Sequence, residues 1–365
     1  MVPLYKRKGF DTKKYLDVQT EAIKNRLSKF GQKLYLEFGG KLCYDFHAAR
    51  VLPGYEPTVK VKLLEKLKDC EIIYCVSAKD IQKGKVRSDL GLTYDKQTLK
   101  DISDIRSFGL NFLAVVITRF EGESLAKRLE VKLKNAGVKV YIHSELEGYP
   151  KDVAKIVSKS GYGRQSYIRT SKPIIIVTGT GGLSGKLATC LAQIYNDHMR
   201  GIKSGYAKFE TFPIWNLPLN HPVNIAYEAA TADIGDYNVV DPFHKKAYGT
   251  VAINYNRDVE SFEIIKRMLE GVVGRDSYMT KYKSPTDMGV NKAGFAIIND
   301  DLVQQAAKQE LIRRYLRYSC EYAMGGSDRK TVQRAELLMK ELNLNVLDRK
   351  VVNMARQASK AAQKK

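Results

Sequence analysis

The sequence predicts an α/β protein in which a mostly parallel sheet forms the middle of three layers. Three observations lead to this fold class. Apolar extended runs alternate with helical periodicity through the first 150 residues, as they do in βαβ units. The run PIIIVTG at 173–179 is apolar throughout, which is typical of a central strand covered on both faces, and a glycine-rich turn follows it. From residue 300 onwards the periodicity is almost entirely helical.

The individual elements follow from local patterns. A helix is predicted over 12–30, with Asp11 as its N-cap and Gly31 at its end. The alternating segment KLYLEFGG predicts a strand at 33–40. Strands at 71–78, 111–118 and 138–143 each follow a predicted helix, at 58–69, 95–107 and 122–136. After the strand at 173–179 we expect helices at 187–201, 258–273, 301–323, 328–343 and 346–362, and short strands near 206–212, 237–241, 251–254 and 293–298.

These patterns divide the chain into three parts. Residues 1–150 form an N-terminal α/β region, and residues 151–299 form a second α/β region with a P-loop-like strand, turn and helix and an α+β insert. Residues 300–365 form a C-terminal helical section that ends in a basic tail. Since no linker rich in proline or glycine separates the parts, we expect them to pack together.

The chain is strongly basic, with 61 Lys and Arg against 40 Asp and Glu among 365 residues, a net charge of +21. A nucleic-acid surface, a small anionic substrate and an ordinary solvated surface each account for such an excess. Most of the lysines alternate with acidic residues on predicted helices, as on a solvated surface. The window 153–196 differs, because it holds six Lys and Arg and no acidic residue. This window surrounds the glycine-rich turn, so its charge favours a small anionic ligand.

The sequence shows neither the patterns of a membrane span or secretory signal nor the cysteine spacing of a disulfide framework or zinc site. No apolar stretch approaches the roughly 20 residues of a membrane span, and the N-terminus lacks the apolar core of a secretory signal. The five cysteines are scattered, with neither a CxxC pair nor zinc spacing. We therefore expect a soluble cytoplasmic protein that has no membrane partner, disulfide framework or structural zinc.

The turn GTGGLSGK has the composition of a phosphate-binding loop. Glycines let an anion approach the backbone N–H groups at the start of a helix, and Lys186 adds a positive charge. The Walker A pattern GxxxxGK[ST] is broken at Thr180 and at Leu187, so the usual magnesium-binding hydroxyl is missing. Ser184, Thr189 and Thr178 are the candidate replacements. The predicted cofactor-binding residues are Thr178, Gly179, Gly181, Gly182, Ser184, Gly185, Lys186 and Thr189.

The same turn also fits the spacing TGxxGxxG of dinucleotide-binding folds. In that interpretation an acidic residue at the end of the next strand holds the ribose, and Glu210 is roughly in place. A lysine at the helix start and acid-free surroundings suit a nucleoside triphosphate better than a dinucleotide. A structural tight turn remains the third interpretation.

Polar groups outside the turn supply further candidates. Asp45, His47 and Arg50 fall within two helical turns after a Gly-Gly loop, where Arg50 would clamp an anion and His47 would act as acid or base. Asn224 and Glu228 share a helix face at i, i+4, with Asn220 as the predicted N-cap. Caps, turns and surface ion pairs explain the same residue types. The predicted catalytic residues are His47, Arg50 and Asp241, and the predicted substrate-binding residues are Asp80, Arg87, Glu210, Asn224, Glu228, Arg257 and Asp287.

Several long blocks resemble one bacterial family, known as domain of unknown function 1846. They include LYLEFGGKL (34–42), FHAARVLPGYEP (46–57), VTGTGGLSGKLATCLAQIY (177–195) and AKFETFPIWNLPLNHPVNIAYEAATAD (207–233). The resemblance runs from about residue 9 to about residue 350 and implies a P-loop-like α/β protein with extra α+β parts, whose reaction is unassigned. Members have a PGxGSGK-type loop where this chain has GTGGLSGK. They commonly continue into a further α/β segment, which we expect this chain to lack.

Together these observations predict an enzyme that binds ATP or a related nucleotide with Mg²⁺ and transfers a phosphoryl or nucleotidyl group to a small anionic substrate. The alternatives are an NAD(P)-dependent oxidoreductase and a nucleic-acid-binding protein without catalysis. We expect the chain to form a homo-oligomer.

Overall fold

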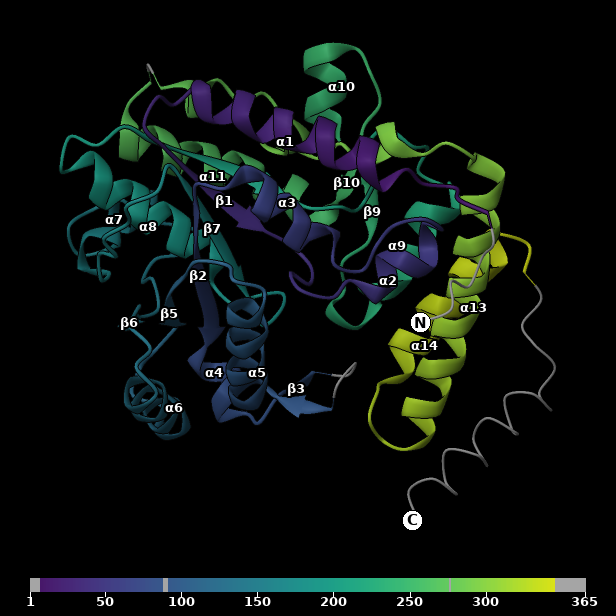
Figure 1. The fold of residues 1–365 in the computed structure, drawn as a ribbon, viewed down its shortest axis with the longest axis horizontal. Helices are drawn as coiled ribbons and strands as arrows, with labels where there is room; N and C mark the ends of the chain where they lie inside the picture. The colour runs from purple at the N-terminus through teal and green to yellow at the C-terminus, as the bar shows by residue number, and fades with distance from the viewer. Residues whose placement is uncertain (1–6, 88–90, 276, 345–365) are drawn as a thin grey trace.

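A computed structural model describes residues 7–87, 91–275 and 277–344 (Figure 1). Its centre is a six-stranded sheet in the order β6-β5-β2-β7-β1-β8, in which all neighbouring strands are parallel. The strands are β1 (Lys33–Phe38), β2 (Cys70–Ser77), β5 (Phe112–Thr118), β6 (Val140–Ile142), β7 (Ile174–Gly179) and β8 (Ser204–Phe209). The predicted α/β class and parallel sheet are confirmed.

Helices cover the sheet on both faces. The connection from β1 to β2 runs toward the β6 edge, whereas the connection from β7 to β8 runs toward the β8 edge. Because parallel crossovers are right-handed, their helices lie on opposite faces. The first connection carries α3 (Val59–Leu67), which contacts α1 (Thr12–Ser28), and the second carries α8 (Lys186–His198), which contacts α11 (Asn256–Val273). On the α3 side, α5 (Tyr94–Ser107) and α6 (Ser124–Asn135) complete the layer.

The core explains which strands are central. Every residue of β2 is buried, and β7 is buried from Ile174 to Thr178, since helices cover both faces of these strands. Their side chains belong to the largest hydrophobic cluster, which also takes in residues of α3, α8 and α11. Among the residues that the structure describes, none of the helices combines the length and the apolar character needed to cross a bilayer.

Smaller elements complete the fold. Two short antiparallel pairs join β3 (Val86–Arg87) with β4 (Leu92–Thr93) and β9 (Asn238–Val240) with β10 (Ile253–Tyr255). The short helices are α2 (Phe46–Val51), α4 (Ala78–Gln82), α7 (Val153–Ile156), α9 (Pro222–Ala230), α10 (Pro242–Tyr248) and α12 (Pro285–Met288), with 3₁₀ turns η1 (Tyr162–Arg164), η2 (Ala232–Ile234), η3 (Tyr278–Lys281) and η4 (Ala293–Ala296).

Two local predictions were wrong. The strand expected at 293–298 contains η4, since small residues there pack closely; a side chain at Gly294 would collide with Asn216. Helix α9 is capped by the His221 imidazole rather than by Asn220, with Pro222 in its first turn. The N-cap of α1 is Asp11, as predicted.

The C-terminal helices α13 (Asp300–Ala323) and α14 (Arg329–Glu341) lie side by side at one end of the molecule, where α13 packs on α2 and α9 (Figure 1). The helix predicted at 346–362 and the basic tail lie outside the described residues. Strands from both sides of the boundary predicted at residue 150 belong to the one central sheet.

Candidate functional site

The carboxyl ends of the central strands form the first candidate site. The connections that leave the neighbouring strands β2 and β7 run toward opposite edges of the sheet. In open α/β sheets, ligands bind in the crevice beyond the carboxyl ends at such a point. Residues 179–186, which we call the glycine loop, leave β7 at this position and lead directly into α8.

The path of the glycine loop requires glycine at two positions. A Cβ on Gly179 would lie 2.3 Å from the Cys75 carbonyl oxygen, and Gly185 has φ +85° with Thr118 only 2.7 Å from the position of a Cβ. The Thr118 hydroxyl donates a hydrogen bond of 2.8 Å to the Ser184 carbonyl. The end of β5 therefore holds the loop against the neighbouring strands.

Polar groups of the glycine loop are left available for a ligand. Lys186 Nζ reaches back 3.0 Å to the Gly181 carbonyl oxygen, and α8 begins at Gly185 without a side-chain cap. The hydroxyls of Thr180 and Ser184 are buried and make no hydrogen bond. Buried orphan groups of this kind indicate a place for a water molecule or a ligand. An anion bound here would find a cation and several donors.

The two other hydroxyls predicted for cofactor binding lie deeper. Thr189 is fully buried on α8, where its oxygen is 3.5 Å from the Cys75 sulfur. Thr178 lies within β7 and, with Gly179, lines a cavity of about 330 Å³. Its other lining residues include Tyr44, Phe46, Tyr74, Asp101 and Asp104. Its volume falls at the small end of the range for ligand pockets.

A charged group lies at the carboxyl end of β8. Lys208 forms ion pairs with Asp258 and, at 3.4 Å, with Glu210. Burial opposes the charged lysine, yet the two carboxylates outweigh it and raise the pKa of Lys208. Burial, partly offset by Lys208, raises the pKa of Glu210 to about 7. The upward direction of this pKa makes Glu210 a candidate general base.

The 3₁₀ turn η2 covers the glycine loop from outside. A Cβ on Gly182 would lie 3.4 Å from Ile234 and 4.0 Å from the Arg257 guanidinium. Arg257 is itself held by Asp236 at 2.9 Å. Of the predicted substrate-binding residues, Arg257 therefore lies beside the glycine loop, and Glu210 lies within electrostatic reach of Lys186.

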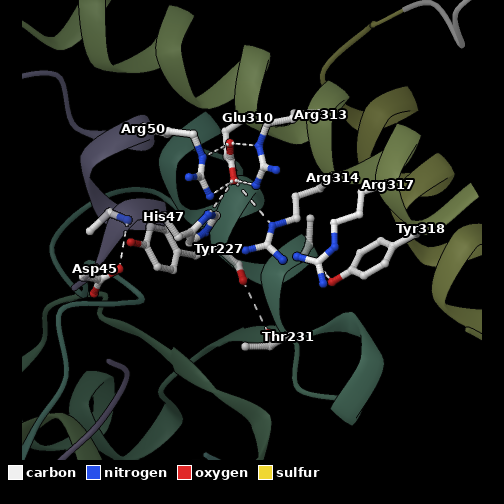
Figure 2. Close-up of polar contacts among 12 residues, drawn as sticks. Asp45, His47, Arg50, Tyr227, Thr231, Glu310, Arg313, Arg314, Arg317 and Tyr318 are labelled. Carbon is white, nitrogen blue, oxygen red and sulfur yellow. Dashed lines mark hydrogen bonds and ion pairs between the residues drawn. The ribbon is translucent and has the colours of Figure 1, made fainter. Parts of the chain in front are cut away.

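A second candidate site lies where α13 meets α2 (Figure 2). Here Glu310 is surrounded by Arg50, Arg313 and Arg314, which we call the arginine cluster. Arg50 and Arg313 each donate two hydrogen bonds to the carboxylate, at 2.6–3.2 Å, while Arg314 Nε lies 3.5 Å away. His47 Nδ1 lies 2.7 Å from the same carboxylate. Burial alone would raise the pKa of Glu310, but the hydrogen bonds from Arg313, His47 and Arg50 hold that pKa well below its usual range.

The arginine cluster changes the roles predicted for His47 and Arg50. Burial, followed by the positive charge of Arg314, lowers the pKa of His47 to about 4, which favours the neutral imidazole over the acid form at pH 7. Arg50 binds the internal carboxylate of Glu310, which occupies the place that the sequence assigns to a ligand. Both residues therefore tie α2 to α13.

The third predicted catalytic residue, Asp241, caps α10. It is fully buried and accepts hydrogen bonds from the backbone N–H of His244 and from the Thr286 hydroxyl. We assign Asp241 to the capping of α10 rather than to catalysis. No cluster of three potential metal ligands occurs in the described ranges 7–87, 91–275 and 277–344.

The remaining predicted substrate residues lie apart from one another. Asn224 is fully buried and bonds to the backbone of Ile214, while Glu228 pairs with Arg334. Both hold α9 in place, since a satisfied buried polar group fixes the packing around it. Asp287 accepts from the Tyr248 hydroxyl. Asp80 lies in α4, with one oxygen 3.9 Å from Lys85, and Arg87 lies in β3.

The sequence comparisons place this chain among uncharacterised proteins. Residues 8–343 match the family described as "Domain of unknown function DUF1846, N-terminal". The chain belongs to this family. A "UPF0371 protein" from Clostridium tetani (strain Massachusetts / E88) is 52% identical over 98% of this chain and 70% of its own length. A relative of the same name from Clostridium botulinum (strain Kyoto / Type A2) is 53% identical over 96% of this chain and 69% of its own length. The family resemblance inferred from the sequence is confirmed.

The sequence alone does not predict several residues of the two candidate sites. Thr180 stands out there only as a break in the Walker pattern, although its buried hydroxyl faces no partner. Glu310, Arg313 and Arg314 have i, i+3 and i, i+4 spacing, which in a sequence is indistinguishable from a solvated helix face. A usable signal exists for Lys208, since it is a charged residue within a short apolar strand.

Proposed function

We propose that this protein is an enzyme that binds the phosphates of an ATP-type nucleotide on the glycine loop and transfers a phosphoryl or nucleotidyl group to a small anionic acceptor. The observation that carries the proposal is the pair of buried, unbonded hydroxyls of Thr180 and Ser184, beside Lys186 at the start of α8. On this proposal the loop is a P-loop-like phosphate site with an altered sequence.

Elementary electrostatics supports phosphate at this place. The uncapped N-terminus of α8 offers backbone N–H groups and the positive end of the helix dipole. Lys186 needs only to exchange the Gly181 carbonyl for a phosphate oxygen. The cavity of about 330 Å³ beside Thr178 and Gly179 gives the rest of a nucleotide space next to the loop.

The fit for Mg²⁺ depends on the nucleotide. Magnesium in such sites is held mainly by phosphates and water with one or two carboxylates. A site of this kind does not need three protein ligands, and the described residues contain no cluster of three potential metal ligands. The hydroxyls of Thr180 and Ser184 are the groups that would stand in for the missing Walker hydroxyl.

The surrounding residues suit group transfer. Such reactions need positioned cations more than covalent chemistry, and Lys186 and Arg257 supply positive charge on two sides of the loop. The acceptor oxygen gives up a proton as it bonds to phosphorus, and the bond from phosphorus to the leaving oxygen breaks. Glu210, with its pKa raised to about 7, is the candidate to receive that proton.

The topology argues against a dinucleotide. In the dinucleotide fold, the strand that carries the ribose-binding acid lies directly beside the strand of the glycine turn. Here Glu210 follows β8, which pairs with β1, and β1 separates it from β7. Glu210 therefore lies one strand farther from the glycine turn than an NAD(P) site requires.

Isothermal titration calorimetry with ATP and Mg²⁺ tests the proposal. We expect saturable binding to the wild-type chain and at least a tenfold loss in Lys186→Ala, because a charge-assisted hydrogen bond is worth about 1.5–3 kcal/mol. Lys127→Ala, on the exposed face of α6, is the matched control and should bind like the wild type. Equal affinity of Lys186→Ala and wild type, or no binding of ATP to either, would refute the proposal.

A further inference from the structure

The arginine cluster carries more positive charge than its single carboxylate can balance. Arg50, Arg313 and Arg314 share Glu310, and His47 is neutral at pH 7. Within 4 Å, in the part of the chain that the structure describes, Glu310 is the only carboxylate paired with these three guanidinium groups. The three guanidinium groups therefore exceed their directly paired carboxylate by two positive charges.

The excess is centred on Arg314. Both oxygens of Glu310 already receive hydrogen bonds from Arg50 and Arg313. Arg314 has only 11% of its side chain exposed, and its Nε is buried without a hydrogen bond. Leaving a buried guanidinium donor unsatisfied is costly, so the arrangement is suited to a second anion. His47 Nε2 is likewise buried without a partner.

Arg317 extends the same face of α13. It follows Arg314 by three residues, and Figure 2 shows both guanidinium groups beside Tyr318, on the side of the cluster away from Arg50. Arg317 pairs with Glu321 on its own helix and takes no part in binding Glu310. Arg314, at the edge of the Glu310 contacts, and Arg317, outside them, thus lie on the same side of the cluster.

This pair of arginines lies near η2, the turn that covers the glycine loop. Asp233 of η2 lies within electrostatic reach of Arg314, Arg317 and Lys85. The next residue, Ile234, is the one that approaches Gly182 of the loop. Lys85 lies over the ring of Tyr94, whose hydroxyl is 3.1 Å from the position of a Cβ on Gly181. The loop and the arginine pair therefore border the same turn of the chain.

We propose that Arg314 and Arg317 form a second oxyanion site, which binds a carboxylate or phosphate group of the small substrate while the glycine loop holds the nucleotide. Its role as a substrate site rests on the proposed function, whereas anion binding by Arg314 and Arg317 does not. Two guanidinium groups present paired N–H donors that match the geometry of either oxyanion. Arg50 and Arg313, in contrast, each donate two hydrogen bonds to Glu310, and the Arg50 contact links α2 to α13.

Calorimetry with inorganic phosphate and with citrate, at constant ionic strength, tests the second site. The full chain carrying Lys186→Ala serves as the background, since this change weakens anion binding on the glycine loop. We expect saturable binding of at least one anion to this protein and at least a tenfold loss on adding Arg314→Gln or Arg317→Gln. If only phosphate binds, we infer that the substrate carries a phosphate group. If only citrate binds, we infer that it carries a carboxylate group.

The control is Arg128→Gln, which removes one positive charge from an exposed position on α6 that is distant in sequence from Arg314 and Arg317. The site is disproved if neither anion binds saturably, if Arg317→Gln binds as the background does, or if Arg128→Gln weakens binding equally. Should Arg314→Gln fail to fold, Arg317→Gln decides, because Arg317 does not contact Glu310.

The ATP titration separates this proposal from the proposed function. If phosphate or citrate binds in a manner that depends on Arg317, but ATP does not bind, the second anion site is supported and the proposed nucleotide-binding function is refuted. If ATP binds in a manner that depends on Lys186, but no anion binding depends on Arg317, nucleotide binding is supported and the second anion site is refuted.

Discussion

The glycine loop and the arginine cluster are built in opposite ways. The loop consists of eight consecutive residues, and its chemistry comes from backbone N–H groups, two hydroxyls and one lysine. The arginine cluster joins side chains separated by about 260 residues along the chain, and its chemistry comes from full charges. The contrast shows that a site made of backbone can be recognised in a contiguous stretch of sequence, whereas a site made of charges requires the fold.

The two regions should also respond differently to mutation. Breaking the arginine cluster removes contacts between α2 and α13 and should first affect folding. Breaking the glycine loop removes donors that face a ligand and should first affect binding. The following changes test that difference, from the largest expected effect to the smallest.

Glu310→Gln should be the most damaging change. It removes the carboxylate that pairs with three guanidinium groups, and loss of one partner of a buried ion pair costs about 3–5 kcal/mol. Urea unfolding followed by circular dichroism measures the free energy of unfolding. Glu263→Gln, exposed on α11, provides the control and should cost almost nothing. Similar stability of the two variants would mean that the cluster does not hold α13 in place.

Acid should weaken the arginine cluster through His47. The pKa of His47 is lowered in the folded chain to about 4 from its ordinary value of 6.5, so the unfolded chain binds an extra proton between these pH values. Stability is therefore full above pH 6.5 and falls as the pH is lowered toward 4, by about 3 kcal/mol for this group. Below that, protonation of Glu310 adds to the loss, since its pKa is also lowered.

Urea midpoints between about pH 7.5 and pH 4 measure this effect in wild type and His47→Gln. The variant should lose less stability across the window. His143 is a useful reference, because burial lowers its pKa to about 4 as well, while its partner is the Ser166 carbonyl and not a charged cluster. A pH profile of His47→Gln that coincides with the wild-type profile would contradict the role given to His47.

Gly185→Ala should disturb the glycine loop more than a comparable glycine elsewhere. A non-glycine residue at positive φ costs about 1–3 kcal/mol, and at Gly185 the new Cβ also meets Thr118. Gly109 has φ +69° with open space around it, so Gly109→Ala measures the backbone strain alone. We expect Gly185→Ala to be the less stable of the two in urea and to bind ATP more weakly. Equal effects would show that the close approach to β5 is unimportant.

Thr118→Val should have the smallest effect. It removes the hydroxyl that donates to the Ser184 carbonyl at 2.8 Å and more weakly to the Val76 carbonyl at 3.3 Å, a shared hydrogen bond worth about 1 kcal/mol. We expect a small fall in the urea midpoint together with a measurable loss of ATP affinity. Ser107→Ala, whose hydroxyl bonds locally at the exposed end of α5, should leave ATP affinity unchanged. If the Thr118→Val protein bound ATP with wild-type affinity, the hydrogen bond that anchors the glycine loop to β5 would not be needed for nucleotide binding.

Much of the fold could be predicted because its signals are local. The strand at 173–179 is recognisable from an unbroken apolar run, and β7 covers 174–179. The helix predicted at 95–107 is observed at 94–107, since its apolar residues repeat at helical spacing. The short elements were harder: η4 packs small residues closely against a neighbouring segment, and nothing in its own sequence distinguishes that packing from a strand.

The candidate sites divide in the same way. Glycine requirements at 179 and 185 were visible in the sequence, and the structure gives each a close backbone or side-chain neighbour. The role of Arg50 was not visible, because its partner Glu310 is 260 residues away. Asp241 and Asn224 were candidates for chemistry because caps and buried hydrogen bonds use the same residue types as active sites.

The sequence by itself determined the α/β class, most of the long helices, the central strand and the glycine loop, since each depends on residues that are neighbours in the chain. Only the tertiary structure decided the order of the strands, which separates Glu210 from β7, and the gathering of three arginines around Glu310. The physical reason is range. Periodicity and backbone conformation act over a few residues, whereas strand order and charge balance are settled only when distant segments pack together.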